Sequence, residues 1–175
     1  MADVIEPQNG PPAVDQTGNL TIWVIPASTP GINLDQITVA DLSAATAKRV
    51  TYSFLPDGWN LTMPQEKNDD PRLTARQRRQ SLGRVNPELA DLGYVDSDDP
   101  SSASEILKDG GAWIFVERRK VANSKVATAG DKVRALKVSL GEQNGAAPNG
   151  TGKFTKTQPV VVDYVSREHA LTAGA

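Results

Sequence analysis

The side chains that carry most enzyme chemistry are nearly absent from this sequence. It has no cysteine, and its single histidine, His169, stands six residues before its last residue. Disulfides, thiolate nucleophiles and Cys-ligated zinc or iron–sulfur centres are therefore excluded. A catalytic triad needs a rigidly held base, and we expect His169 to lie in a loose tail. Asp69 and Asp70 adjoin in a polar stretch, where solvation explains them better than acid–base catalysis. We expect no enzyme and no cofactor.

Two segments resemble ligand-binding loops but lack essential positions. Residues 146–154, AAPNGTGKF, resemble a phosphate-binding loop. Ala147 stands where that loop needs glycine, Phe154 stands where it needs Ser or Thr, and we expect a strand to follow instead of a helix. Asp96-Ser97-Asp98-Asp99 resembles the start of a calcium loop, but Leu107 stands where the closing glutamate belongs. We therefore expect neither a nucleotide site nor a metal site.

Basic residues gather in two places, at positions 72–84 and 118–120. Such clusters can contact phosphate, or they can keep a solvated or subunit-facing strand edge from aggregating. The net charge of −2 and the low aromatic content favour the second interpretation. The candidate residues for a charged interface are Arg72, Arg76, Arg78 and Arg79.

The composition predicts a subunit that gains stability from neighbouring copies. The 175 residues allow one domain, and only about a fifth of them are Val, Ile, Leu or Phe, so the core is thin. Residues 1–47 hold five acidic residues and no Lys or Arg, which leaves +3 for the remainder. This asymmetry suits contacts between copies, although a random surface pattern would also produce it. No segment has the length of a membrane span or the pattern of a signal peptide, so we expect synthesis in a cytoplasm and no membrane contact.

Hydrophobic patterning predicts a mainly β domain over residues 20–165, between an extended arm at 1–19 and a tail at 166–175. Alternation around the turn Pro56-Asp57-Gly58 predicts a hairpin over residues 50–63. Residues 64–71 read as a polar loop, and a phase slip at Ala135 predicts a β-bulge. The expected strands are 20–25, 72–85, 89–95, 112–116, 132–140 and 153–165, and the expected helices lie within 37–47 and at 102–109, the second with a capping box.

Residues 141–152, GEQNGAAPNGTG, predict a long mobile loop between two strands. Loop length costs little free energy, so an unusually long loop invites a function. We expect this loop to contact a neighbouring subunit. The candidate residues are Gly141, Asn144, Gly145, Asn149, Gly150 and Gly152.

Several phrases give the chain a resemblance to the tail tube proteins, or major tail proteins, of long-tailed bacteriophages that infect actinobacteria. They are DDPRLTARQ at 69–77, SEILKDGGAWIFVERR at 104–119, GDKVRALKVSLGEQ at 130–143 and GKFTKTQPVVV at 152–162. With the expected hairpin around Trp59, the resemblance spans residues 18–165.

The resemblance implies a β-sandwich or barrel-like fold with one short flanking α-helix and long loops. It also implies hexameric rings stacked into the tail tube of the virion, through which the genome passes. The implied partners are the tape measure protein, the tail terminator and tip proteins, and DNA that moves through the lumen without specific binding. The residues fit equally a capsid decoration protein or a tail completion protein. A nucleic-acid-binding module is a third interpretation.

Overall fold

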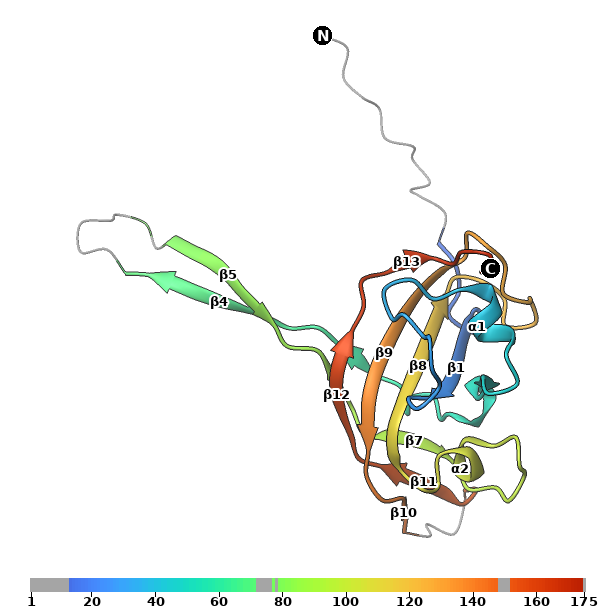
Figure 1. Cartoon of the computed structure of the whole chain (residues 1–175). Helices are drawn as coiled ribbons and strands as arrows, with labels where there is room; N and C mark the ends of the chain where they lie inside the picture. Colours follow the sequence, from blue (N-terminus) through green and yellow to red (C-terminus); the bar gives the residue numbers. More distant parts are fainter. Residues whose placement is uncertain (1–12, 72–76, 78, 148–151, 175) are drawn as a thin grey trace.

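A six-stranded antiparallel sheet forms the centre of the molecule (Figure 1). The computed structural model describes residues 13–71, 77, 79–147 and 152–174. The strand order is β12, β9, β8, β1, β2, and β13 also pairs with β9. The strands are β1 (Leu20–Pro26), β2 (Lys48–Arg49), β8 (Gly111–Arg119), β9 (Lys132–Leu140), β12 (Val160–Val165) and β13 (His169–Ala170).

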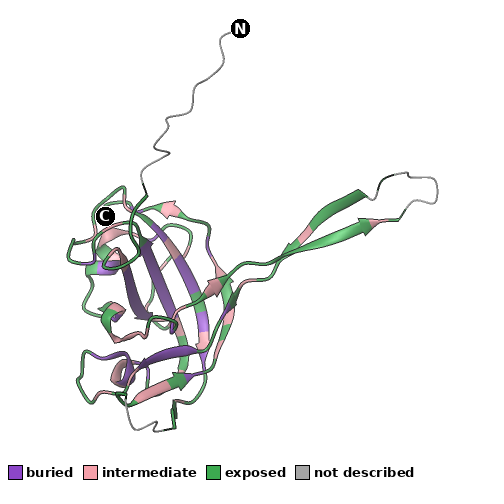
Figure 2. Ribbon diagram, turned by 180° about the vertical axis from the view of Figure 1, so that it is seen from behind, coloured by how far each residue is buried: buried purple, intermediate pink, exposed green. Residues whose placement is uncertain are grey.

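Strands β1 and β8 are buried on both faces, as their continuous apolar runs predict. Their register runs without interruption from Leu20 opposite Arg119 to Pro26 opposite Trp113. Ile22 and Phe115 point into one core cluster, and Trp23 and Ile114 point into the other. Figure 2 shows these strands as the buried part of the sheet. The prediction of a central strand at 112–116 is confirmed.

One face of the central sheet is covered by a smaller three-stranded sheet and a short helix. The small sheet has the order β10, β11, β7. A buried hydrogen bond, donated by the Tyr94 hydroxyl to Gln158 Oε1 at 2.9 Å, connects two of its strands. The elements are β10 (Asn144–Gly145), β11 (Thr155–Gln158), β7 (Leu92–Val95) and α2 (Ala103–Ile106).

Helix α1 (Val39–Ser43) packs over the other core cluster through the buried Leu42. Its first turn carries a capping box between Thr38 and Asp41. Helix α2 starts at its expected cap, because the Ser102 hydroxyl accepts a hydrogen bond from the Glu105 amide at 3.2 Å. The mainly β prediction is therefore confirmed, with two short α-helices where the resemblance implied one.

The predicted hairpin over residues 50–63 is wrong. Thr51–Ser53 forms a 3₁₀ turn, η1, and Phe54 forms a bridge with Tyr94 of β7. Farther along, β3 (Leu61–Thr62) pairs with β6 (Glu88–Leu89). The two halves pair with different strands, although the rings of Phe54 and Trp59 pack against each other. Only the turn is present, with the Gly58 amide donating to the Leu55 carbonyl at 3.0 Å.

The expected polar loop at 64–71 is also wrong, since β4 (Gln65–Asp70) pairs antiparallel with β5 (Arg79–Val85). The two strands form a hairpin that stands away from the rest of the molecule (Figures 1 and 2). Nearly all of its described residues are exposed. With no apolar face, the hairpin leaves no alternating signal in the sequence.

Three features differ from expectation near the end of the chain. Strand β9 pairs with β8 without a register shift, and the bulge lies instead in β12 between Val162 and Tyr164. Both phases of β9 are apolar because both of its faces are buried. Pro159 divides the expected strand 153–165 into β11 and β12, which belong to different sheets. Beyond Val165 the chain returns to β9 as β13, and Leu171 is buried.

Candidate assembly surface

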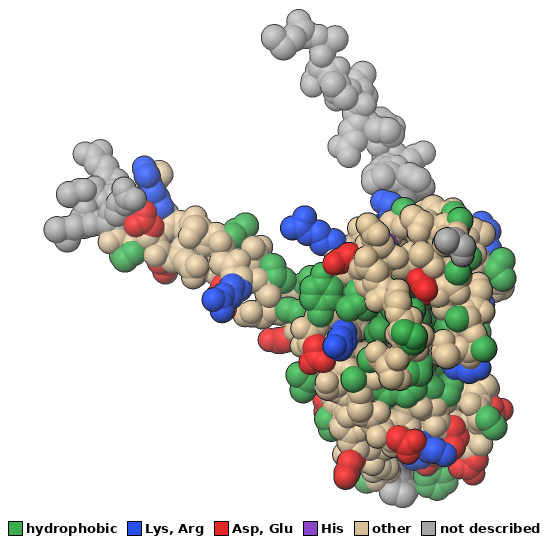
Figure 3. Space-filling model, in the orientation of Figure 1, with side chains coloured by type: hydrophobic (Ala, Val, Ile, Leu, Met, Phe, Trp, Pro, Cys, Tyr) green, Lys and Arg blue, Asp and Glu red, His purple; other side chains and the backbone are tan. Residues whose placement is uncertain are grey.

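The β4–β5 hairpin is the most exposed regular element among the described residues. Lys67 lies opposite Leu82, and Asp69 lies opposite Gln80, whose amide donates a 2.7 Å hydrogen bond to the Asp69 carboxylate. Figure 3 shows mostly polar side chains and backbone along it. Leu82 is 69% exposed and Val85 is 44% exposed, so two large apolar side chains of β5 lie on the surface of a mostly polar element. A two-stranded ribbon of this kind is at most marginally stable in water unless another surface covers it.

The base of the hairpin is held against the sheets by two tight contacts. A Cβ placed on Gly58 would lie 1.9 Å from the Gly93 carbonyl oxygen, so the two backbones touch where no side chain fits. The indole nitrogen of Trp59 donates a 2.6 Å hydrogen bond to the buried carboxylate of Glu117. The Trp59 ring also packs against Phe115, with 5.3 Å between ring centroids. The hairpin therefore projects from a rigid support.

The predicted charged interface falls at the far end of this hairpin. Arg72, Arg76 and Arg78 lie outside the described residues. Arg79 begins β5, lies opposite Asp70 and is exposed. The sequence analysis missed the hairpin that carries Arg79. Its only sequence signal is the tight cluster of polar residues on both sides of Pro71.

The second basic cluster does not form one charged edge. Arg118 is fully buried, whereas the side chain of Arg119 is 53% exposed and pairs with Glu117. Lys120 follows with a φ of 64°, in the left-handed region. The interpretation of residues 118–120 as a solvated or subunit-facing edge is therefore wrong for Arg118.

The loop over residues 141–152 is partly built into the fold. The Gly141 carbonyl accepts a 2.9 Å hydrogen bond from the Gln158 amide, and Asn144–Gly145 forms β10. Gly152 lies in a bend, and Asn149 and Gly150 lie outside the described residues. The loop thus begins as a strand of the small sheet, which the sequence analysis missed.

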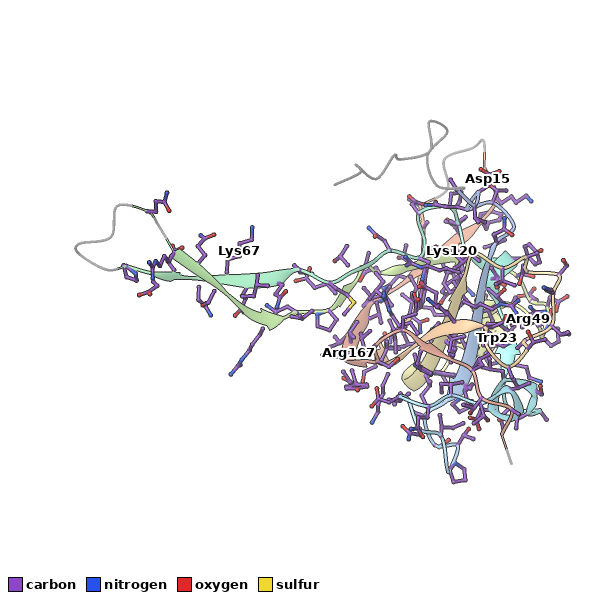
Figure 4. All side chains as sticks on the ribbon, turned by 90° about the horizontal axis from the view of Figure 1, so that it is seen from above. Asp15, Trp23, Arg49, Lys67, Lys120 and Arg167 are labelled. Carbon is purple, nitrogen blue, oxygen red and sulfur yellow. The ribbon has the colours of Figure 1, made fainter. Side chains whose placement is uncertain are left out.

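A polar recess of about 640 Å³ lies where β2, η1, the start of α2 and the β8–β9 connection meet. Arg49 and Lys153 are its cationic lining residues. Arg49 and Arg118 both lie over the ring of Trp23, each 5.2 Å from its centroid. Figure 4 shows Arg49 beside Trp23. Burial and the nearby Arg118 cation lower the pKa of Arg49. The described lining holds Arg49 and Lys153 and no acidic residue, so the recess is positively charged, and the sequence patterns did not predict it.

The segment at residues 96–99 that resembles a calcium loop, and the single histidine, make contacts within the fold. The Asp96 carboxylate accepts a 2.8 Å contact from the Lys156 ammonium, and Asp99 accepts hydrogen bonds from Ser101. His169 Nε2 accepts a 3.1 Å hydrogen bond from the Ile37 amide. In the part of the chain that the structure describes, no group of three or more His, Asp or Glu side chains is placed to hold a metal ion. No helix there is both long and apolar enough to cross a membrane.

Comparison of the sequence with known protein families gives a match. The family model for the phage tail tube protein matches residues 7–175, nearly the whole chain. The chain belongs to the phage tail tube protein family. No curated protein matches it. As a tail tube protein it is a viral structural protein of the phage tail.

Proposed function

We propose that this tail tube protein assembles into hexameric rings that stack into the tube through which the phage genome is ejected. The β4–β5 hairpin carries the proposal. It projects from a rigid base, has no apolar face of its own and reaches space that no other described element occupies (Figure 1). A neighbouring copy, in the same ring or in the next one, would bury it.

The free edge of the central sheet supports contacts within a ring. Strand β12 pairs with β9 on one side and has no strand on its other side among the described residues. Its side chains include Val161, 66% exposed, and Tyr164, 43% exposed. An edge that carries apolar side chains favours pairing with another chain. Contacts between two different surfaces close into a ring or continue as a filament, depending on their geometry.

The partners follow from the same proposal. The tape measure protein would occupy the lumen during assembly, and terminator and tip proteins would bind the two ends of the tube. DNA must slide through the lumen, so we expect weak binding of duplex DNA without sequence preference. A sub-micromolar affinity with a steep salt dependence would instead support a nucleic-acid-binding module.

The direct test is electron microscopy of the purified protein at high concentration with and without the hairpin. In the deletion variant, an Asn-Gly turn replaces residues 65–85 between Pro64 and Asn86, whose backbones already share a 2.9 Å hydrogen bond. The intact protein is expected to form stacked rings. The deletion variant is expected to keep its circular dichroism spectrum and to form no tubes. Closed small oligomers from the intact protein would favour a capsid decoration or tail completion protein.

A milder substitution tests the hairpin surface itself. Leu82→Ser removes an apolar side chain that is 69% exposed, and Val126→Ser removes one that is 72% exposed on the β8–β9 connection. Only Leu82→Ser is expected to raise the protein concentration needed for tube formation. An equal effect of both substitutions would show that general surface hydrophobicity, and not the hairpin, drives assembly.

A further inference from the structure

The recess beneath Tyr52 has the chemistry of a carboxylate-binding site. Its described lining includes Arg49, Lys153, several hydroxyls and no acidic residue. The hydroxyls of Thr51 and Ser53 accept backbone amide hydrogens from Ile22 and Ala103. A hydroxyl can accept and donate at the same time, so each still has a hydrogen to direct at a ligand.

Charge balance around the recess also calls for an anion. Two guanidinium groups, of Arg49 and Arg118, share the ring of Trp23. Asp131 pairs with Arg118 at 2.8 Å, whereas Arg49 donates to the Asn123 and Lys125 carbonyls, which are neutral. Among the described residues, Arg118 thus has a carboxylate partner and Arg49 has none. A second carboxylate would relieve the repulsion between them.

The rim of the recess has the composition of a protein contact. Tyr52 lines the recess beside Arg49 and is 82% exposed. Exposed aromatic side chains beside an arginine are typical of the residues that dominate binding energy between proteins. A small soluble anion would leave the Tyr52 side chain in water. The expected occupant is therefore a carboxylate carried on a polypeptide.

The acidic first part of the chain, residues 1–47, supplies such a polypeptide. Residues 1–47 hold five acids and no base. Asp35 and Asp41 accept hydrogen bonds from Tyr164 and Thr38 of their own chain. The other three, Asp3, Glu6 and Asp15, precede β1.

We propose that the recess lined by Arg49 and Lys153 binds a carboxylate from the segment before β1 of a second copy. The inference rests on the proposed function, because it requires copies of this chain to meet. It adds a specific electrostatic contact to the assembly, separate from the hairpin. The hydroxyls of Thr51 and Ser53 complete the site from the recess side.

The test measures the critical concentration for tube formation by sedimentation at fixed ionic strength. Lys153→Gln removes one cation of the recess, and Lys137→Gln removes an exposed cation of β9 as the matched control. Lys153→Gln is expected to raise the critical concentration about fivefold, the size of one good surface charge pair. Lys137→Gln is expected to leave it within about twofold. Equal values for both variants and the wild type would overturn the inference.

A double-mutant cycle identifies the partner. The variant D3N/E6Q/D15N neutralises the segment before β1, and we expect its effect to match that of Lys153→Gln and not to add to it. Additive effects would overturn the inference. So would an effect of these substitutions on unfolding below the assembly concentration, which would place the carboxylate in the same chain. If the wild type forms no tube, the proposed function fails; if it forms tubes and the cycle is additive, only this inference fails.

Discussion

Arg118 and Asp131 form an ion pair, 2.8 Å from Nη1 to Oδ2, that organises the connection between β8 and β9. The Arg118 side chain is fully buried, whereas that of Asp131 is 15% exposed. Both guanidinium amino groups also donate to residues of β1 and of the connection. The further acceptors are Thr21 Oγ1 and the carbonyl oxygens of Ala122, Lys125 and Val126.

Removing the guanidinium should therefore destabilise the protein strongly. Arg118→Met leaves several carbonyl oxygens and the Asp131 carboxylate without their donor. We expect the free energy of unfolding to fall by about 3 kcal/mol. Urea denaturation measures this, with the exposed Lys137→Met as the control, expected to change it by less than about 0.5 kcal/mol. An equal loss in both variants would show that Arg118 does not organise the connection.

The same pair predicts a loss of stability in acid. Burial opposes ionisation of Asp131, but hydrogen bonds from Arg118 and Thr128 outweigh it and lower the pKa of this carboxyl below its ordinary value. The pair therefore contributes fully above the pKa of the unfolded state, and its contribution disappears as the pH falls through the lower pKa of the folded state. Asp131→Asn should be less stable than the wild type at pH 7, and the difference should shrink toward pH 2. Urea denaturation across this range tests it, and a constant difference would contradict the prediction.

The contact between Gly58 and Gly93 predicts a sharp intolerance of any side chain. Gly58→Ala places a Cβ 1.9 Å from a backbone oxygen, so the backbone must move. We expect a loss of about 2 to 3 kcal/mol, typical of overpacking. Gly145→Ala is the matched control, because a Cβ there has no atom within 4 Å. Thermal unfolding of both variants tests the prediction, which fails if Gly58→Ala melts at the wild-type temperature.

Shortening the Gly-rich loop tests its role as a contact between subunits. Deletion of residues 147–151 leaves three residues between Ala146 and Thr155, whose backbones share a 2.9 Å hydrogen bond. A three-residue hairpin connection preserves β10 and β11, so we expect the melting temperature to change by only a few degrees. Tube formation, followed by electron microscopy, is expected to stop. Normal tubes from the shortened protein would show that the loop makes no contact between subunits that assembly requires.

The sequence predicted the parts of the fold in which neighbouring residues share the same surroundings, such as a strand buried on both faces or a helix cap. The run at 112–116 is apolar because both faces of β8 are buried, and Ser102 stands at a helix cap with Glu105 three residues later. Phe54 and Trp59 alternate with polar residues as a hairpin would, and their rings pack together with 5.7 Å between centroids. Phe54 nevertheless forms a bridge with Tyr94, and Leu61 pairs with Leu89, instead of the two segments pairing with each other. That difference depends on tertiary contacts that a local pattern does not contain.

The candidate surface was less predictable for the same physical reason. Strands β4 and β5 are polar on both faces, so no periodicity marks them. Arg118 reads as a surface charge, but five hydrogen bonds and a tryptophan ring compensate its burial. The recess combines residues from β2, the start of α2 and the segment before β11, which only folding brings together. Composition predicted a subunit that gains stability from neighbouring copies, but it did not predict which surfaces would meet them.

Gly58 contacts Gly93 at the base of the hairpin. Because the hairpin is long, a small rotation of its strands at this contact moves their far end by a much larger distance. Substitutions near Arg79 change the side chains that the hairpin presents to a neighbour, whereas substitutions at Gly58 or Trp59 change the direction in which the hairpin projects. Variants at the base are therefore expected to assemble with a changed spacing between subunits, even though every residue at the contact itself is unchanged.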